Sequence, residues 1–224
     1  MKKSLIIIFL MISTVSFSQD IVEKQIGEFK ELKVYDLIQV KLVQSSENKI
    51  EITGKHTDKV VFVNKNGKLK IKMDIEEVYN GDETKVTLYY TGCDIIDGNE
   101  GSYIYSNDLI KQFDIELSAQ EGAKIDVELE TSYATIKAYT GGHIKAKGTS
   151  KNQNVSVSAG GIYEAKNLIS ETTEVKVKAG GEASVHATEL ADVKITAGGN
   201  IYIYGNPKEV NESKAMGGTV KRMD

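Results

Sequence analysis

The sequence contains almost none of the residues that cross-link small secreted domains. Its single cysteine, Cys93, excludes an internal disulfide framework. A lone cysteine could be a reactive thiol, an intermolecular link or a small buried filler, and we favour the filler. There is one proline and no tryptophan among 224 residues, whereas there are 20 glycines and 11 tyrosines. This composition suits an all-β protein with tight glycine corners.

An excess of basic charge is also missing. The chain has 28 basic and 32 acidic side chains, and loss of Lys2 and Lys3 with an N-terminal signal would leave 26 against 32, a net charge of −6. This balance argues against nucleic acid as a partner. Beyond the N-terminus no apolar run is long enough to span a bilayer as a helix, so the sequence predicts no transmembrane segment.

The N-terminus has the features of a secretory signal. Two lysines precede an apolar run over 5–10, and small residues stand at Ser16 and Ser18. We therefore expect a signal peptide over 1–18 and cleavage before Gln19. The protein is then exported, to the periplasm, the outer-membrane surface or the extracellular space.

Motifs for catalysis and metal binding are absent from the sequence. The three histidines, His56, His143 and His186, have no metal-ligand spacing, and there is no HExxH or GxSxG motif. Asp126, Glu128 and Glu130 alternate along a strand whose outward face would be charged in any case. The sequence therefore predicts no enzyme, no catalytic residue, no cofactor and no metal.

The dominant feature is a phrase that returns through the second half of the chain. It reads IKAYTGGHIKA at 136–146, VSVSAGGIYEA at 155–165, VKVKAGGEASV at 175–185 and VKITAGGNIYI at 193–203, with a shorter copy, AMGGTV, at 215–220. Gly122 and the second glycine of each pair are spaced by 20, 19, 20, 18 and 19 residues. Such a fixed period indicates a stacked repeat.

Each copy predicts two strands with a glycine bend between them. Apolar residues alternate with polar ones on both sides of the bend, which is typical of half-buried strands. We place Ala159, Ala179 and Ala197 on the apolar face before the bend. Glycine suits the bend because it tolerates positive φ and has no side chain to crowd the corner. The structural glycines are Gly141, Gly142, Gly160, Gly161, Gly180, Gly181, Gly198, Gly199, Gly217 and Gly218.

A repeat of 18–20 residues suits one rung of a β-solenoid. A flat antiparallel meander would also show alternation, but it would not explain the register of the glycines. We expect one domain over 19–224, less regular over 25–112 and built of regular Gly-Gly rungs over 113–220. Residues 92–107 break the rhythm and are expected to form a loop outside the wall. Residues 210–223 are expected to seal the last rung.

These features together resemble a known family. The Gly-Gly repeats, the ending GGNIYIYGNP at 198–207 followed by GGTV at 217–220, and the opening FKELKVYDLIQVKL at 29–42 are similar to the putative auto-transporter adhesin, head GIN domain family. The resemblance covers residues 25–222. It implies a right-handed, single-stranded β-helix in a secreted bacterial envelope protein, and it supplies no catalytic residues.

The candidate binding residues are outward lysines and tyrosines of the repeats. They form an expected Lys/Tyr wall of Tyr139, Lys176, Lys178, Lys194, Tyr202 and Tyr204. We expect an adhesin-like module that binds glycans, acidic ones in particular, or cell-surface partners. The alternatives are a structural envelope protein whose surface is merely solvated and, more weakly, a carbohydrate-active enzyme. Clustering of Tyr139, Tyr202 and Tyr204 would favour binding, and scattered tyrosines would favour the structural reading.

Overall fold

The computed structural model describes residues 22–223, so the predicted signal peptide over 1–18 lies outside the described residues. The fold is nearly all β, with 70% of the residues in strands. The strands in chain order are β1 (Val22–Gln25), β2 (Glu31–Val34), β3 (Gln39–Gln44), β4 (Lys49–Gly54), β5 (Val60–Lys65), β6 (Lys68–Met73), β7 (Thr84–Tyr90), β8 (Ile95–Gly98), β9 (Tyr103–Ala119), β10 (Lys124–Ala138), β11 (His143–Ser158), β12 (Ile162–Lys178), β13 (Glu182–Ala197), β14 (Asn200–Tyr204), β15 (Glu209–Met216) and β16 (Thr219–Arg222). A short 3₁₀ helix, η1 (Thr57–Lys59), precedes β5. The all-β fold class predicted from the sequence is confirmed.

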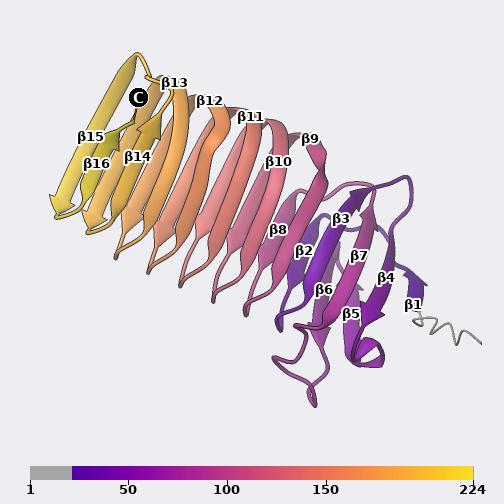
Figure 1. Cartoon of the computed structure of the whole chain (residues 1–224). Coiled ribbons are helices and arrows are strands. Elements are labelled where there is room, and N and C mark those ends of the chain that lie inside the picture. The colour runs from indigo at the N-terminus through magenta and orange to yellow at the C-terminus, as the bar shows by residue number, and fades with distance from the viewer. Residues whose placement is uncertain (1–21, 224) are drawn as a thin grey trace, which may run out of the picture.

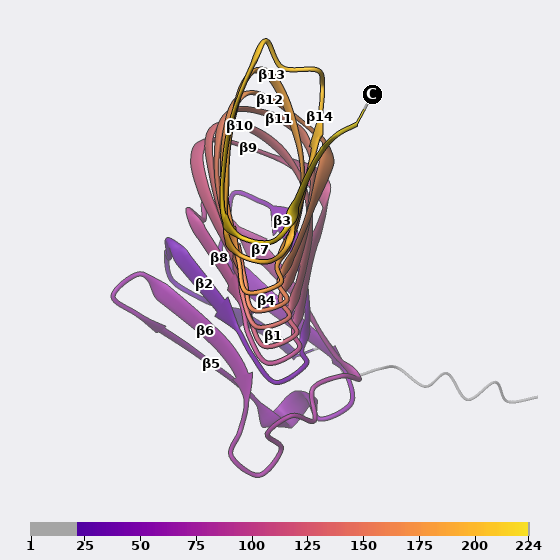
Figure 2. The ribbon, with the colours of Figure 1, turned by 90° about the vertical axis from the view of Figure 1, so that its left-hand side faces the viewer.

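The strands wind into a β-solenoid of about seven turns, as predicted (Figure 1). Seen along the stack, the coils superimpose as elongated loops with two long sides (Figure 2). The parallel register gives the length of each rung: Lys124 pairs with His143, His143 with Ile162 and Ile162 with Glu182. These steps of 19, 19 and 20 residues reproduce the sequence period.

The long strands cover both sides of a coil. We call the side that follows each glycine turn the first wall; it contains β3, β7 and the starts of β9–β13, with β14 and β16. The second wall precedes each glycine turn and contains the ends of β9–β13 with β15. Strand β13 shows the division, because Glu182–His186 pairs with β14 on the first wall whereas Leu190–Ala197 pairs with β15 on the second.

The core between the walls is one continuous cluster from Ile26 to Ile203. The predicted inward residues fill it: Ile144, Val155 and Val175 are each fully buried. Tyr163 is also fully buried, and its hydroxyl donates a 2.7 Å hydrogen bond to Oε1 of Gln153 inside the core. The polar end of this tyrosine is therefore satisfied without reaching water.

The two glycines of each turn have different roles. The first takes positive φ, +73° at Gly141, and has open space where a Cβ would stand. The second lies against the rung before it, since a Cβ on Gly142 would be 2.0 Å from the carbonyl oxygen of Ala119. The prediction that Ala159, Ala179 and Ala197 face the core was wrong, because all three are exposed: Ala159 and Ala179 lie in turns with φ of +49° and +51°, and Ala197 is the last residue of β13.

The N-terminal rungs do not stack in sequence order. Strand β3 lies between β7 and β9, and β2 lies between β6 and β8. The coil of β2 and β3 therefore lies between two later coils, and the coil of β6 and β7 lies nearer the end of the stack. Antiparallel strands then close this end, with β4 and β1 added beyond β7 and β5 added beyond β6. These strands pair the edges that the outermost coil would otherwise leave open.

The prediction of a loop over 92–107 was wrong. Strand β8 pairs with β2 and with the end of β9, and the turn after it leads into the start of β9, so this segment is a full rung. The inward positions of β8 are Ile96 and Gly98, whereas Asp97 stands in the outward row of Lys33 and Ser118 and is nevertheless buried. The alternation is hidden because Asn99 is buried as well, and its backbone N–H donates a 3.1 Å hydrogen bond to Oγ of Ser102.

Candidate functional site

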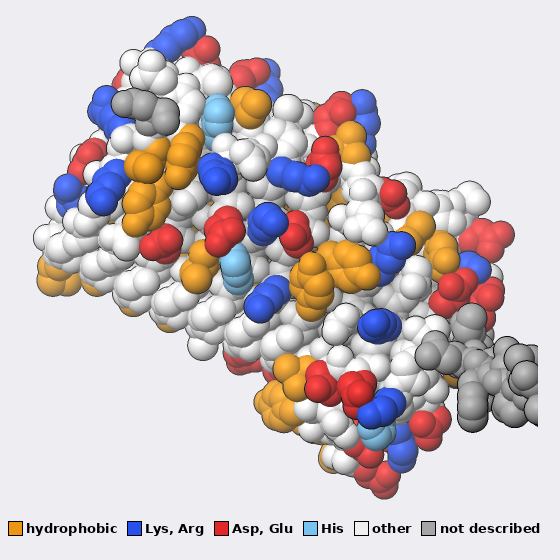
Figure 3. Space-filling model, in the orientation of Figure 1, with side chains coloured by type: hydrophobic (Ala, Val, Ile, Leu, Met, Phe, Trp, Pro, Cys, Tyr) orange, Lys and Arg blue, Asp and Glu red, His pale blue; other side chains and the backbone are white. Residues whose placement is uncertain are grey.

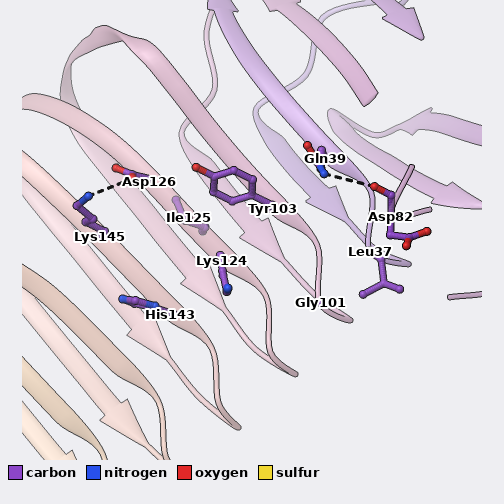
Figure 4. Close-up of a pocket in the computed structure, with 10 residues that line it drawn as sticks. All are labelled: Leu37, Gln39, Asp82, Gly101, Tyr103, Lys124, Ile125, Asp126, His143 and Lys145. Atoms are coloured by element: carbon purple, nitrogen blue, oxygen red, sulfur yellow. Dashed lines mark hydrogen bonds and ion pairs between the residues drawn. The ribbon is translucent and has the colours of Figure 1, made fainter. Parts of the chain in front are cut away.

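One hollow lies on the first wall, where β3 and the starts of β9, β10 and β11 stand side by side (Figure 4). Its volume is about 510 Å³. The lining side chains that matter chemically are Gln39, Tyr103, Lys124, Asp126, His143 and Lys145. They gather polar, charged and aromatic groups on one rigid sheet surface.

The register of the rungs brings these residues together. Tyr103 pairs with Gln39 on one side and with Lys124 on the other, and Lys124 pairs with His143. Two residues further along these strands, Tyr105 pairs with Asp126, and Asp126 pairs with Lys145. Both rows point outward, because the residues between them, such as Ile104 and Ile125, are buried in the core.

Two tyrosines form the aromatic part of the surface. The rings of Tyr103 and Tyr105 stack with centroids 5.1 Å apart and planes 18° from parallel. Burial raises the pKa of Tyr103, so its hydroxyl remains a donor at neutral pH. A second hollow of about 300 Å³ continues past Tyr105 to Glu128 and Lys147, and it shares Tyr103, Asp126 and Lys145 with the first. The aromatic pair therefore lies between two joined depressions.

Charges on this surface are matched in opposite pairs across neighbouring rungs. Nζ of Lys145 lies 3.4 Å from a carboxylate oxygen of Asp126, and Nζ of Lys147 lies 3.0 Å from one of Glu128. Such exposed pairs add little stability, but they cancel charge locally. In Figure 3 basic and acidic side chains are interspersed on the face turned to the viewer, between hydrophobic groups near the middle of the stack and toward its C-terminal end. The surface suits a polar ligand of low net charge.

The structure divides the predicted Lys/Tyr wall between the two walls. Four of its members, Tyr139, Lys176, Lys178 and Lys194, line one hollow of about 290 Å³ on the second wall. The remaining two, Tyr202 and Tyr204, lie on β14 of the first wall. Residues before and after a glycine turn face opposite sides of the flattened coil, so they cannot form one surface. The three predicted tyrosines do not cluster.

Tyr103 and Tyr105 were not among the predicted site residues, because their segment was expected to form a loop. The signal that could have found them is the alternation of Tyr103, Ile104 and Tyr105. It continues the row of Lys124 at a distance of one rung, although the step is 21 residues rather than 18–20.

The fold and this exposed surface define a class of protein: a β-solenoid whose walls present long rows of outward side chains. The family described as "putative auto-transporter adhesin, head GIN domain" matches residues 28–207. The chain belongs to this family, as its resemblance indicated. The family description favours a binding protein over an enzyme and suggests a surface or extracellular location.

Solved structures share the fold. A putative adhesin from Bacteroides fragilis is 20% identical with a TM-score of 0.84, covering 93% of this chain and 98% of that one. A putative adhesin from Parabacteroides distasonis is 22% identical with a TM-score of 0.70, covering 92% and 97%. A putative lipid binding protein from the same species is 17% identical, also with a TM-score of 0.70, covering 93% and 98%. A comparison with curated proteins finds no match.

Within residues 22–223 no helix has the length and apolar character needed to cross a membrane. In the same range no three His, Cys, Asp or Glu side chains are grouped so that they could hold a metal ion.

Proposed function

We propose that this chain is an exported adhesin-like module that binds surface glycans through the first-wall hollows around Tyr103 and Tyr105. The observation that carries the proposal is the stacked tyrosine pair between two joined depressions. Aromatic rings offer apolar faces to the C–H faces of sugars, and their hydroxyls remain available for hydrogen bonds. The N-terminal sequence supports export to the periplasm, the outer-membrane surface or the extracellular space.

The polar groups around the tyrosines suit sugar hydroxyls. Gln39 offers an amide group and Lys124 an amino group, both in the same row as Tyr103, whereas Nε2 of His143 is buried and lies 3.2 Å from a carboxylate oxygen of Glu164. The carboxylates of Asp126 and Glu128 are acceptors, already held in place by Lys145 and Lys147. Rigid positioning of this kind reduces the entropy that is lost on binding. A neutral or weakly charged oligosaccharide is the ligand that this surface fits best.

The test is a glycan-array screen of residues 19–224, followed by titration of any ligand found. The double variant Tyr103→Ala/Tyr105→Ala should lose binding at least tenfold while keeping its circular dichroism and melting temperature. The matched control is Tyr202→Ala/Tyr204→Ala, which removes the same atoms from the other end of the same wall. The control should bind like the unmodified protein.

Other results would change the proposal in definite ways. Loss of binding in the control alone would move the site to β14. Equal binding by all three proteins would exclude the exposed tyrosines as the site. No glycan bound by the folded protein would favour the structural envelope role, and pull-down from whole envelopes would then search for a protein partner.

A further inference from the structure

A cluster of lysines distinguishes the second wall from the first. Lys176 on β12 pairs directly with Lys194 on β13, and Lys178 stands two residues further along β12. Neighbouring strands are about 4.8 Å apart, so Lys176 and Lys194 are like charges directly opposite one another. Such pairs are destabilising unless an opposite charge compensates them. All three lysines line the hollow of about 290 Å³ together with Tyr139.

Acidic side chains within the protein balance this cluster only in part: Glu174 and Asp192 raise the pKa of Lys176. Lys176 contacts Glu174 at 2.5 Å, but among residues 22–223 neither Lys178 nor Lys194 has a carboxylate within 4.0 Å. Lys137, in the row of Lys176, is paired with Glu116 at 2.6 Å. The described lining of the hollow includes no acid, whereas Asp82 and Asp126 line the larger hollow of the first wall.

Neutral hydrogen-bond donors complete the hollow. Hydroxyl groups come from Ser156 and Ser158 on β11 and from Thr196 on β13, on either side of the β12 strand that carries Lys176 and Lys178. Burial raises the pKa of Tyr139, so its phenol stays protonated and can donate at neutral pH. Ammonium and hydroxyl donors around an open space are the groups that bind an oxyanion.

We propose that this lysine hollow binds the carboxylate or sulfate group of an acidic glycan. A hollow of about 390 Å³ lies next to it along the same strands; Tyr133, Asn152, Asn154 and Thr172 line it, and so do the acids Glu174 and Asp192, which favour an uncharged part of the ligand there. Asn154 precedes Ser156 by two residues, so the two hollows lie on consecutive outward positions of one strand. Amide and hydroxyl groups there can contact the uncharged part of the sugar chain, which favours a glycan over a free inorganic anion.

This proposal does not rest on the first-wall site, because the two surfaces lie on opposite walls and share no residue. The chain would then offer one surface for neutral sugars and another for acidic ones. The two sites can be lost independently.

The experiment measures affinity by calorimetry for a sulfated oligosaccharide, a uronic-acid oligosaccharide, a neutral oligosaccharide and inorganic sulfate alone. The test variant is Lys178→Gln/Lys194→Gln. The control is Lys70→Gln/Lys72→Gln, which makes the same charge change on the exposed face of β6, outside both hollows. We expect at least a tenfold loss for an acidic oligosaccharide in the test variant and less than a twofold loss in the control. Affinity should also fall as salt is raised, because the contacts are ionic.

Equal losses in both variants would overturn the proposal, since net charge alone would explain them. Failure of the unmodified, folded protein to bind either acidic oligosaccharide would overturn it as well. Inorganic sulfate binding as tightly as the oligosaccharides would overturn the glycan assignment and leave a site for a free oxyanion. Loss of neutral-sugar binding in Tyr103→Ala/Tyr105→Ala, with acidic binding retained, would confirm that the two sites are separate.

Discussion

The N-terminal rungs and the Gly-Gly rungs make their corners by opposite means. At the corner between β2 and β3, Asp36 and Leu37 both take positive φ, +56° and +64°. The Asp36 side chain, almost fully buried, accepts hydrogen bonds from the amides of Met73 at 3.0 Å and Tyr79 at 3.2 Å. The later corners instead use glycines, which have no side chain. A solenoid corner can therefore be fixed either by a buried carboxylate or by close backbone contact.

The two ends of the stack are also closed by different means. Antiparallel strands close the N-terminal end, whereas the C-terminal end is a last rung of β15 and β16. In this rung Glu212 and Lys214 continue the core rows of Val193 and Ile195, and they pair with each other at 2.8 Å. Charged residues at core positions discourage the addition of another rung. The N-terminal end is closed by added antiparallel strands, and the C-terminal end by charged side chains.

Removal of the C-terminal rung should have the largest effect. A chain truncated after Pro207 loses β15 and β16, which exposes the fully buried Ile195 and Ile201 and leaves two unprotected edges. We expect oligomers or insoluble protein, measured by light scattering after size exclusion. A soluble monomer that melts at the same temperature as the full chain would contradict the sealing role of this rung.

The second largest effect on stability is expected from replacing one of the two glycines of a corner. Gly142→Ala places a Cβ against the carbonyl of Ala119, and we expect a loss of about 3 kcal/mol in the free energy of unfolding. Gly141→Ala meets no such contact and should lose only about 1 kcal/mol through its positive φ. Urea unfolding measures both variants. Equal losses would show that conformation alone, without crowding, fixes these corners.

Asp36→Ala tests the corner of the N-terminal rungs. It removes the acceptor for two backbone amides, and we expect a loss of about 2 kcal/mol in the free energy of unfolding. The control, Asp36→Asn, keeps one carbonyl oxygen and should lose less. Urea unfolding again gives the comparison. If alanine is tolerated as well as asparagine, the hydrogen bonds of Asp36 do not hold the corner.

Chemical labelling of Cys93 should give the smallest effect, and it reports on the unfolding of the N-terminal rungs. Burial raises the pKa of its thiol to about 12, so the folded protein should not react with iodoacetamide at pH 8. In the unfolded chain the pKa returns to about 8.5, and labelling becomes fast. If the continuous core unfolds as one unit, labelling should follow global unfolding in urea. Labelling at lower urea would show that the N-terminal rungs open first.

The regular half of the fold could be predicted from the sequence because its information is local and repeated. Alternation gives the inward residues, and the fixed spacing of glycines gives the rung length, as the register from Lys124 to Glu182 confirms. Outward residues such as Lys176 and Lys194 could also be assigned to one row. A repeat of this kind leaves each position few alternatives.

Tertiary structure alone decided the order of the first coils and the composition of the surfaces. Local sequence does not predict that β2 and β3 lie between later strands. That arrangement depends on non-local pairing with β6, β7, β8 and β9. Nor does the sequence place Tyr202 on the opposite wall from Lys194, since the intervening turn determines which way each row faces. The sequence by itself determined the rung, its glycines and its core. The stacking of distant rungs determined that Tyr103 and Tyr105 stand beside Lys124 and that three lysines share one hollow.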